Sequence, residues 1–452
     1  MISSIESSTS GGIAGAAEVE PRKRREHCRA PLPVAVVGTG SRFSAYHRKY
    51  IVKHPDRIRV VAVADPDTQR RDEVARQHQI PPERCFDSWE QVAARPGLAP
   101  AVINTTMDRV HYPSAMALLR TGYDMLLEKP IADSEAQVRD IIETSRRLDR
   151  KVMVCHGLRY SPFYYKIKEL IAEGRIGRVM SIAAAEYVSY DHMAGAFVRG
   201  KWRRMRDAMP MILAKCCHDT DLIVWLMEGI RPARVASFGS LMHFHPRQAP
   251  AGSSDRCLND CKIESSCEYS ARTLYFSRIA PAMRQQTGAA AEIDDATIAT
   301  ELEALRTTSP YGRCVWRCDN DVVDHQSVLI EFEDGATATL NMIGNAARAT
   351  RDIHVVGTRG EIMGDLKEGL LHVRKPMPAD FERRYSEETF NIPYGKDNHG
   401  GNDERIIEDF VALMLGEPTS KARTRVEDSL LGHQIGFAAE ESRLRRQIVE
   451  LK

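Results

Sequence analysis

Residues 33–65 constrain the fold of this chain more than any other segment. They contain a short β-branched strand, "PVAVVG", a glycine turn leading into helical spacing, "GTGSRFSAYHRKYIVKH", and a second strand ending in an acid, "IRVVAVADPD". This order is typical of a dinucleotide-binding unit, in which the helix N-terminus receives the pyrophosphate and the acid accepts hydrogen bonds from the ribose. We expect the cofactor to contact Gly38, Gly40, Ser41, Arg42, Asp65 and, after the next strand, Thr105.

Two details of this unit bear on the cofactor. Asp65 would repel a 2′-phosphate on the ribose, which favours NAD over NADP, although Arg70 and Arg71 lie close in the sequence. Phe43 stands where the third glycine of the motif would let the helix pack closely on the strand. We therefore predict that Phe43 displaces a neighbour or points away from the sheet, while Gly38 and Gly40 preserve phosphate binding.

Strands and helices continue to alternate after Asp65 and predict a doubly wound parallel sheet. The helical segment "DSEAQVRDIIETSRRLD" has an N-terminal cap at Asp133 or Ser134. Later segments are mainly strands, with hairpin turns expected at Asp334–Gly335 and Arg359–Gly360. They indicate a second, α+β domain with an open, mostly antiparallel sheet, so the predicted fold class is α/β overall.

The predicted organisation has three parts. They are a disordered tail over 1–31, a dinucleotide-binding Rossmann domain over 32–155, and a substrate-binding and oligomerisation domain over 156–452 that carries an insertion at about 241–325.

The motif "LLEKP" at residues 126–130 gives the first indication of a family. It follows the glycine turn and precedes "HGLRYSPFYYKIKELIAEGRIGRV". In this order the chain resembles the glucose–fructose oxidoreductase / inositol dehydrogenase (Gfo/Idh/MocA) family from residue 32 to the end. The resemblance implies that Glu128 and Lys129 lie at the cofactor, that Lys129 also approaches a sugar hydroxyl, and that the proline bond is often cis. The chemistry agrees, because a cation near the hydroxyl oxygen assists loss of its proton as hydride departs.

The stretch "MILAKCCHDTDLIVW", residues 211–225, predicts a helix that faces the substrate. The resemblance implies an Asp and a His four residues apart on this helix. His218 matches the histidine, but Ala214 occupies the aspartate position and Lys215 stands beside it. The predicted catalytic residues are therefore Lys129, His218 and Lys215. The side chains of consecutive helical residues such as Cys217 and His218 point about 100° apart, so they cannot easily bind one metal ion together. We therefore expect the two adjacent cysteines to be packing residues rather than metal ligands.

Substrate contacts are expected mainly around "YVSYDHMAGAFVRGKWRRMRD". Five cations occur here with no acid between them and Asp207, at Arg199, Lys201, Arg203, Arg204 and Arg206. They form either a solvated loop or a clamp for an anionic sugar. The predicted substrate-binding residues are Arg159, Tyr190, His192, Arg199, Trp202, Arg203, Asp221 and, in a loop that resembles one of the family, His399.

Ten cysteines in a chain without a predicted signal peptide indicate a reducing compartment, the cytoplasm. Five of them fall in the insertion, as C-x3-C-x5-C followed by C-x3-C: Cys257, Cys261, Cys267, Cys314 and Cys318. A structural zinc or another cluster is one interpretation of this group. Disulfides or free thiols are the alternatives. A tetrahedral metal site would use four of the five cysteines and leave the fifth unbound.

Composition and charge limit the partners. The net charge is +1 and no apolar run is long enough to span a bilayer, so we expect neither nucleic acid nor membrane binding. The leading interpretation is an NAD-dependent oxidoreductase acting on a hydroxyl of a sugar, sugar acid or cyclitol. The alternatives are a glycosidase that uses tightly held NAD for transient oxidation and elimination of a glycoside, and a non-catalytic sensor. The resemblance implies a homodimer or homotetramer formed through the outer face of the second sheet.

Overall fold

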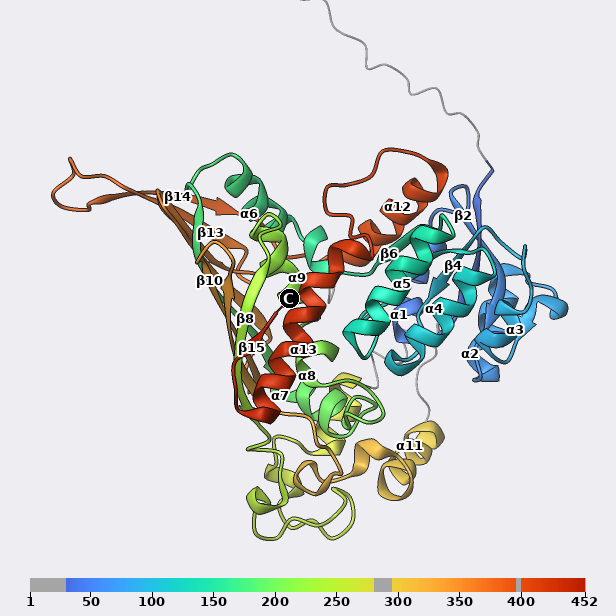
Figure 1. The fold of residues 1–452 in the computed structure, drawn as a ribbon. Coiled ribbons are helices and arrows are strands. Elements are labelled where there is room, and N and C mark those ends of the chain that lie inside the picture. Colours follow the sequence, from blue (N-terminus) through green and yellow to red (C-terminus); the bar gives the residue numbers. More distant parts are fainter. Residues whose placement is uncertain (1–29, 280–294, 396–399, 452) are drawn as a thin grey trace, which may run out of the picture.

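The computed structural model describes residues 30–279, 295–395 and 400–451. Two β-sheets organise them, one from the N-terminal third and one from the rest of the chain (Figure 1). The predicted disordered tail, apart from its last two residues, and the predicted site residue His399 lie outside the described residues.

The first sheet has six strands in the order β3-β2-β1-β4-β5-β6, and every neighbouring pair is parallel. Its strands are β1 (Leu32–Val37), β2 (Ile58–Ala64), β3 (Cys85–Phe86), β4 (Ala101–Asn104), β5 (Asp124–Leu127) and β6 (Val152–Val154). The strand order reverses between β1 and β4, where sheets of this type bind ligands at the carboxyl ends of the strands. The predicted doubly wound fold is confirmed.

Helices cover both faces of the first sheet. They are α1 (Ser41–Tyr46), the π-helix η1 (His47–Ile51), α2 (Thr68–His78), α3 (Trp89–Ala93), α4 (His111–Arg120), α5 (Glu135–Arg147) and α12 (Asn402–Leu415). α3, α4 and α5 share one apolar core with the sheet, whereas α1, η1 and α12 share the other. Because α12 comes from near the end of the chain, the C-terminal part helps to build the core of the first sheet.

The second sheet has nine strands in the order β14-β13-β12-β11-β7-β10-β9-β8-β15. They are β7 (Val179–Ser189), β8 (Pro232–Ser240), β9 (His325–Phe332), β10 (Thr337–Ala346), β11 (Thr350–Gly357), β12 (Gly360–Asp365), β13 (Leu370–Pro376), β14 (Tyr385–Asn391) and β15 (Val449–Glu450). Only the β7–β10 pair is parallel, which confirms the mostly antiparallel sheet.

Local signals set several of the turns and caps. The β9–β10 hairpin turns at Asp334 and Gly335, as predicted, with Gly335 at a φ of +83°. The β11–β12 hairpin pairs Gly357 with Gly360, so its turn lies at residues 358–359, one position before the predicted one. Ser134 caps α5 by accepting a hydrogen bond from the Gln137 amide.

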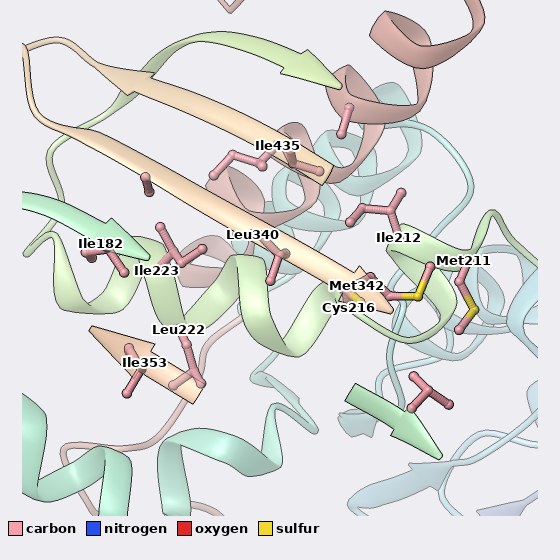
Figure 2. Packing of buried hydrophobic residues seen from close by; sticks show 14 of the residues in the cluster. Ile182, Met211, Ile212, Cys216, Leu222, Ile223, Leu340, Met342, Ile353 and Ile435 are labelled. Carbon is pink, nitrogen blue, oxygen red and sulfur yellow. The ribbon is translucent and has the colours of Figure 1, made fainter. Parts of the chain in front are cut away.

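One face of the second sheet is covered and the other is open. The helices α6 (Pro162–Ala172), α9 (Cys217–Leu226) and α13 (Leu430–Arg445) lie on the face toward the first sheet (Figure 1). Figure 2 shows Leu222 and Ile223 of α9 packed against the sheet residues Leu340 and Ile353. On the opposite face Phe238 is 75% exposed and Leu329 is 52% exposed on the paired strands β8 and β9.

The insertion between β8 and β9 has little regular structure. In its described parts it contains short 3₁₀ segments, a π-helix over Arg272–Ile279 and the helix α11 (Asp295–Thr307). Its own apolar cluster is small, with Cys257, Ala271, Tyr275 and Leu305 as the buried members. In the described portion of the chain, none of the helices has the length and apolar character needed to cross a membrane.

Candidate active site

Gly38 determines the geometry of the turn after β1. Its φ is +85°, and a Cβ placed on it would lie 2.6 Å from the Thr105 carbonyl oxygen. The Thr105 amide donates to the Val37 carbonyl at 2.9 Å, so the close approach joins β1 to the end of β4. A Cβ added to Gly40 would meet no atom within 4 Å, which leaves this side of the turn accessible to a ligand. The cradle therefore fits a dinucleotide pyrophosphate.

Asp65 is placed at the carboxyl end of β2 and is only 4% exposed. Its Oδ2 accepts hydrogen bonds from the Thr39 amide at 2.6 Å and the Thr39 hydroxyl at 2.9 Å. Its Oδ1 accepts from the Asp67 amide at 2.8 Å and pairs with Arg70 at 3.1 Å. Burial alone would raise the pKa of Asp65, but these hydrogen bonds and the Arg70 charge lower it overall. Asp65 is thus an ionised acceptor beside the glycine turn.

Phe43 does not occupy the phosphate side of the turn. It is 1% exposed and belongs to the apolar core between the first sheet and α12. The departure from glycine is absorbed by packing Phe43 into that core.

Ser41 is the exposed first residue of α1, beside the turn. The Arg42 guanidinium is directed elsewhere. It donates to Glu128 at 2.9 Å and to Asp403 of α12 at 2.8 Å. Glu128 is 3% exposed and also accepts from the Tyr46 hydroxyl. The Arg42–Glu128 pair ties the glycine turn to the Glu-Lys-Pro segment, and the contact of these two residues with the cofactor stays a prediction.

Lys129 reaches from the first sheet to the second half of the molecule. The Lys129–Pro130 peptide bond is cis. The Lys129 Nζ donates to the Ala214 carbonyl oxygen at 2.8 Å. This carbonyl is available because the predicted helix over 211–225 is broken: α8 (Met211–Ala214) ends and α9 begins at Cys217. The break brings the ammonium to the N-terminus of α9.

His218 lies in the first turn of α9, next to this contact. Its Nδ1 is buried and has no hydrogen-bond partner among the described residues. Burial lowers the pKa of His218 well below its usual value, and the charges of Lys129 and His156 lower it further. The ring is therefore neutral at neutral pH and is able to accept a proton.

Two further histidines, which the sequence did not single out, surround His218. The His156 ring lies 5.7 Å from the His218 ring and 5.8 Å from the His433 ring, centroid to centroid. Neither ring nitrogen of His156 has a hydrogen-bond partner among the described residues, and burial lowers its pKa. His433 is satisfied, since its Nδ1 lies 2.9 Å from the Ser429 carbonyl and its Nε2 accepts from the Ile131 amide at 3.0 Å. Position 156 follows directly on β6, and this strand-end location was the only signal in the sequence.

Lys215 points into a separate ionic network. Its Nζ lies 3.1 Å from Glu186 of β7. Arg351 of β11 lies 2.6 Å from the other Glu186 oxygen and 2.7 Å from Asp219. Lys215 thus shares an acidic partner with Arg351 and, unlike Lys129, joins the segment before α9 to the second sheet.

Arg159 and Asp221, both predicted to bind substrate, bind each other instead. The guanidinium donates to the two carboxylate oxygens at 2.7 Å each. Arg159 is 4% exposed and Asp221 is 1% exposed. The pair joins the segment after β6 to α9 and positions the helix that carries His218.

Family models match both parts of the chain. The model described as an oxidoreductase family NAD-binding Rossmann fold matches residues 32–156, and the model of the C-terminal alpha/beta domain of the same family matches residues 168–451. The chain belongs to the Gfo/Idh/MocA oxidoreductase family.

Relatives and solved structures agree with this family. The Bacillus subtilis (strain 168) protein named "Putative oxidoreductase YteT" is 27% identical over 362 residues, covering 78% of this chain and 79% of that protein. Inositol 2-dehydrogenase of Rubrobacter xylanophilus is 30% identical over 204 residues, 44% of this chain and 52% of that enzyme. The solved levoglucosan dehydrogenase complex with NADH has a TM-score of 0.66 at 18% identity, covering 93% of this chain and 99% of that chain, which shows a shared fold.

Within this family member, the five cations predicted as a clamp are not brought together. Arg199 is 2% exposed and donates to the carbonyls of Arg313 and Tyr269 inside the insertion. Arg203 and Arg204 both pair with Asp319, at 2.9 and 3.1 Å. Arg206 lies 3.6 Å from Asp207. Arg199 is thus bonded inside the insertion, whereas Arg203, Arg204 and Arg206 share two acids, Asp207 and Asp319, and the clamp interpretation stays a prediction for these three residues.

Lys201 and Trp202 do face the nucleotide-binding half. The Trp202 Nε1 donates to Asp108 at 3.1 Å, and the Lys201 Nζ lies 3.4 Å from the Met107 sulfur. Asp108 and Met107 follow β4, close to Thr105. These two residues extend the second domain over the end of the first sheet.

Tyr190 and His192 form the short helix α7 (Tyr190–His192) at the end of β7. The Tyr190 ring lies 6.2 Å from Tyr269, and the His192 ring stacks on Phe197 at 5.8 Å. His192 is exposed and acts electrostatically on Glu186. His192 therefore lies near the Lys215–Glu186 pair, and Tyr190 contacts the insertion through Tyr269.

The cysteines separate into two groups. Cys216 and Cys217 are at most 1% exposed and belong to the interior, which agrees with their predicted packing role. Nine described cysteines are free thiols. Among the described residues, no three potential ligands already form a metal-binding group. The five-cysteine site is corrected in one respect: Cys318 donates to the Cys314 carbonyl at 3.2 Å and does not line the cavity shared by the other four.

Proposed function

We propose that the protein is an NAD-dependent oxidoreductase that oxidises a hydroxyl of a sugar, sugar acid or cyclitol. The observation that carries this proposal is the placement of Lys129, held at the Ala214 carbonyl, close enough to the buried His218 for its charge to help lower the His218 pKa, where the two halves of the chain join. A positioned cation and a neutral base are what removal of a hydroxyl proton requires.

Residues from different parts of the fold have different roles in this proposal. Gly38, Gly40 and Asp65 would hold the dinucleotide, which supplies the hydride acceptor when bound. His218 takes the hydroxyl proton, because its lowered pKa keeps it unprotonated at neutral pH. Lys129 stabilises the negative charge that develops on the same oxygen. The Lys129 ammonium has three N–H donors, so it can donate to the substrate oxygen while it keeps the Ala214 carbonyl as an acceptor.

Asp65 supports NAD rather than NADP as the cofactor. Its carboxylate is ionised and lies where the adenosine ribose of a Rossmann domain is bound. A 2′-phosphate would meet this negative charge, although Arg70 pairs with it and is itself half exposed. The preference is therefore expected to be marked but not absolute.

The substrate class rests on the relatives together with the site. Inositol 2-dehydrogenase and levoglucosan dehydrogenase are named for a cyclitol and a sugar derivative. In this chain Lys201, Trp202 and Asp108 would line the approach with polar groups and one aromatic face. Such a surface suits a polyhydroxylated ring.

A panel of cyclitols, sugars and sugar acids tests the proposal directly. The full-length protein with NAD should produce NADH with at least one member, detected at 340 nm. If the protein binds NAD but turns over no member of the panel, the result would contradict the proposal and favour a non-catalytic sensor.

An NAD-dependent glycosidase is the second candidate. The pairing of His218 with a second neutral histidine, His156, favours it, since elimination of an aglycone needs an additional proton carrier. The same panel, extended to glycosides, separates the two functions. Cleavage without NADH accumulation indicates the glycosidase, and NADH accumulation without cleavage indicates the dehydrogenase.

We also propose a homodimer or homotetramer formed through the open face of the second sheet. The exposed Phe238 and Leu329 on adjacent strands support it. The free thiols support a reducing compartment such as the cytoplasm. A net charge of +1 supports a small carbohydrate, rather than nucleic acid or a membrane, as the partner.

A further inference from the structure

Four thiols of the insertion line one small cavity. They belong to Cys257, Cys261, Cys267 and Cys314, and the volume of the cavity is about 10 Å³. A space of this size holds about one water-sized particle. The cavity lies in the insertion, and none of the residues that we assign to catalysis lines it.

Main-chain pairing brings the distant cysteines together. Arg256 and Arg313 form an isolated antiparallel bridge. Beside it, the Cys257 amide donates to the Gly312 carbonyl and the Cys314 amide donates to the Asp255 carbonyl, each at 2.9 Å. Two segments more than fifty residues apart are thus held in register at the cavity. This pairing brings Cys257 and Cys314 to the cavity, which Cys261 and Cys267 also line.

A buried cation faces the same thiols. Arg199 is 2% exposed, and its guanidinium donates to the Cys257 sulfur at 3.4 Å. Its other hydrogen bonds go to two neutral carbonyls, and in the described part of the chain no carboxylate forms an ion pair with it. Glu264, which also lines the cavity, accepts from Ser270 and lies 3.9 Å from Arg272. Burying a charge without a counter-charge costs free energy. Negative charge on the thiols would therefore be stabilised by Arg199.

We propose that Cys257, Cys261, Cys267 and Cys314 bind one zinc ion as thiolates. Binding releases the thiol protons to solvent and creates a zinc–tetrathiolate of net negative charge, which Arg199 compensates and hydrogen-bonds. Tetrahedral sulfur sites hold zinc or iron–sulfur clusters, and a cavity for a single small particle favours the single ion. The thiols do not yet form a ready-made ligand group, so they must close on the ion by side-chain rotation.

The fold gives the zinc a structural task. The insertion has only a small apolar cluster of its own, and segments of this kind gain stability from a cross-link. Arg199 lies two residues before Lys201, which extends toward the nucleotide-binding half. The zinc centre would therefore also fix the segment that borders the substrate approach.

Metal analysis of the full-length protein, purified under reducing conditions without chelator, tests the proposal. We expect about one zinc per chain and negligible iron. Cys261→Ser and Cys267→Ser should each lower the zinc content severalfold and lower the melting temperature. Cys318→Ser is the matched control, because this thiol belongs to the same insertion but does not line the cavity, and it should retain the metal.

Two measurements on the unaltered protein keep the test valid if a cysteine variant fails to fold. Thiols titrated in the native protein should be protected by the metal and should become reactive after extraction with a strong chelator. Cobalt substituted for zinc should give the charge-transfer absorption of tetrahedral thiolate ligation. Metal-free protein of undiminished melting temperature, stoichiometric iron and sulfide, disulfides among the four cysteines, or equal zinc loss in Cys318→Ser would each overturn the proposal.

Discussion

The two ends of the proposed active site satisfy their polar groups in opposite ways. At the nucleotide end, both oxygens of Asp65 already accept hydrogen bonds, and its pKa is lowered although burial opposes this. At the reacting end, both nitrogens of His156 and the Nδ1 of His218 are buried without a hydrogen bond to any described residue, and the pKa values of both rings are lowered. The first end keeps a fixed charge, whereas the second keeps neutral rings with unused hydrogen-bonding capacity.

This difference matches two physical tasks. A binding site gains from groups that are already oriented and need no rearrangement. A proton-transfer site needs a group that is unprotonated at the working pH and whose lone pair is free. Damage at the two ends should therefore appear in different measurements, and the predictions below use that separation.

The largest effect is expected at the reacting end. Lys129→Met and His218→Ala should each lower kcat by a factor of about 100 to 10,000, because each removes a positioned proton-transfer or charge-stabilising group. NAD affinity, measured by fluorescence titration, should change by no more than a few-fold. The double variant should be less than additively worse, since the two groups act in one step.

A normal turnover of His218→Ala on a good substrate would show that α9 is structural. Loss of NAD affinity in the same variant would instead show that the two ends are not separable, and the comparison would fail.

His156 sharpens the comparison, since it contacts His218 without being assigned to the substrate. His156→Phe fills the space with a ring that has no nitrogen, and it should lower kcat by about tenfold through the coupling of the two residues. The acidic limb of the pH profile of kcat should shift together with the loss, because a proton on His156 opposes protonation of His218. A purely structural role would change stability and leave the profile in place.

His433 predicts an acid sensitivity of the reacting end. Burial lowers its pKa from 6.5 to about 4, so the unfolded chain takes up a proton before the folded chain does. Its stabilising contribution is therefore complete above pH 6.5 and is lost as the pH falls toward 4. The expected loss at pH 5 is about 2 kcal/mol. Urea unfolding at pH 7 and pH 5 should show this difference, and His433→Gln should reduce it. An equal pH dependence in the variant would contradict the assignment.

At the nucleotide end, Asp65→Ala should change selectivity more than rate. The preference for NAD over NADP, measured as the ratio of kcat/KM values, should narrow by about tenfold, because the repulsive carboxylate is removed while Arg70 remains. Asp65→Asn, which keeps the shape, is the matched control for charge alone. Equal use of both cofactors by the unaltered protein would contradict the ribose-site assignment.

The smallest effect is expected for Lys215→Ala. Lys215 pairs with Glu186, which keeps Arg351 as a second partner, so kcat should fall by less than about fivefold. A loss of kcat comparable to that of His218→Ala would place Lys215 in the proton-transfer path and would contradict its assignment to a separate ionic network.

The nucleotide end could be predicted from the sequence because its parts are neighbours in one strand–turn–helix–strand unit. Gly38 and Asp65 follow from local spacing, and Lys129 from a short motif. The reacting end depends on partners that are distant in the sequence. No local pattern shows that Arg159 pairs with Asp221, that Arg199 turns into the insertion, or that His156 lies against His218. Charge runs in a sequence do not reveal which acids lie opposite them in the fold.

The contact of Lys129 with the Ala214 carbonyl has a consequence for how the site tolerates change. The resemblance to the family implies an aspartate at position 214, whereas this chain presents a main-chain oxygen to the lysine. Replacing the side chain at 214 leaves that oxygen in place, so ordinary substitutions there cannot abolish the contact. Only an alteration of the backbone path, such as closing the break between α8 and α9, would remove it. The side chain at position 214 can therefore change while Lys129 keeps the same main-chain hydrogen-bond acceptor.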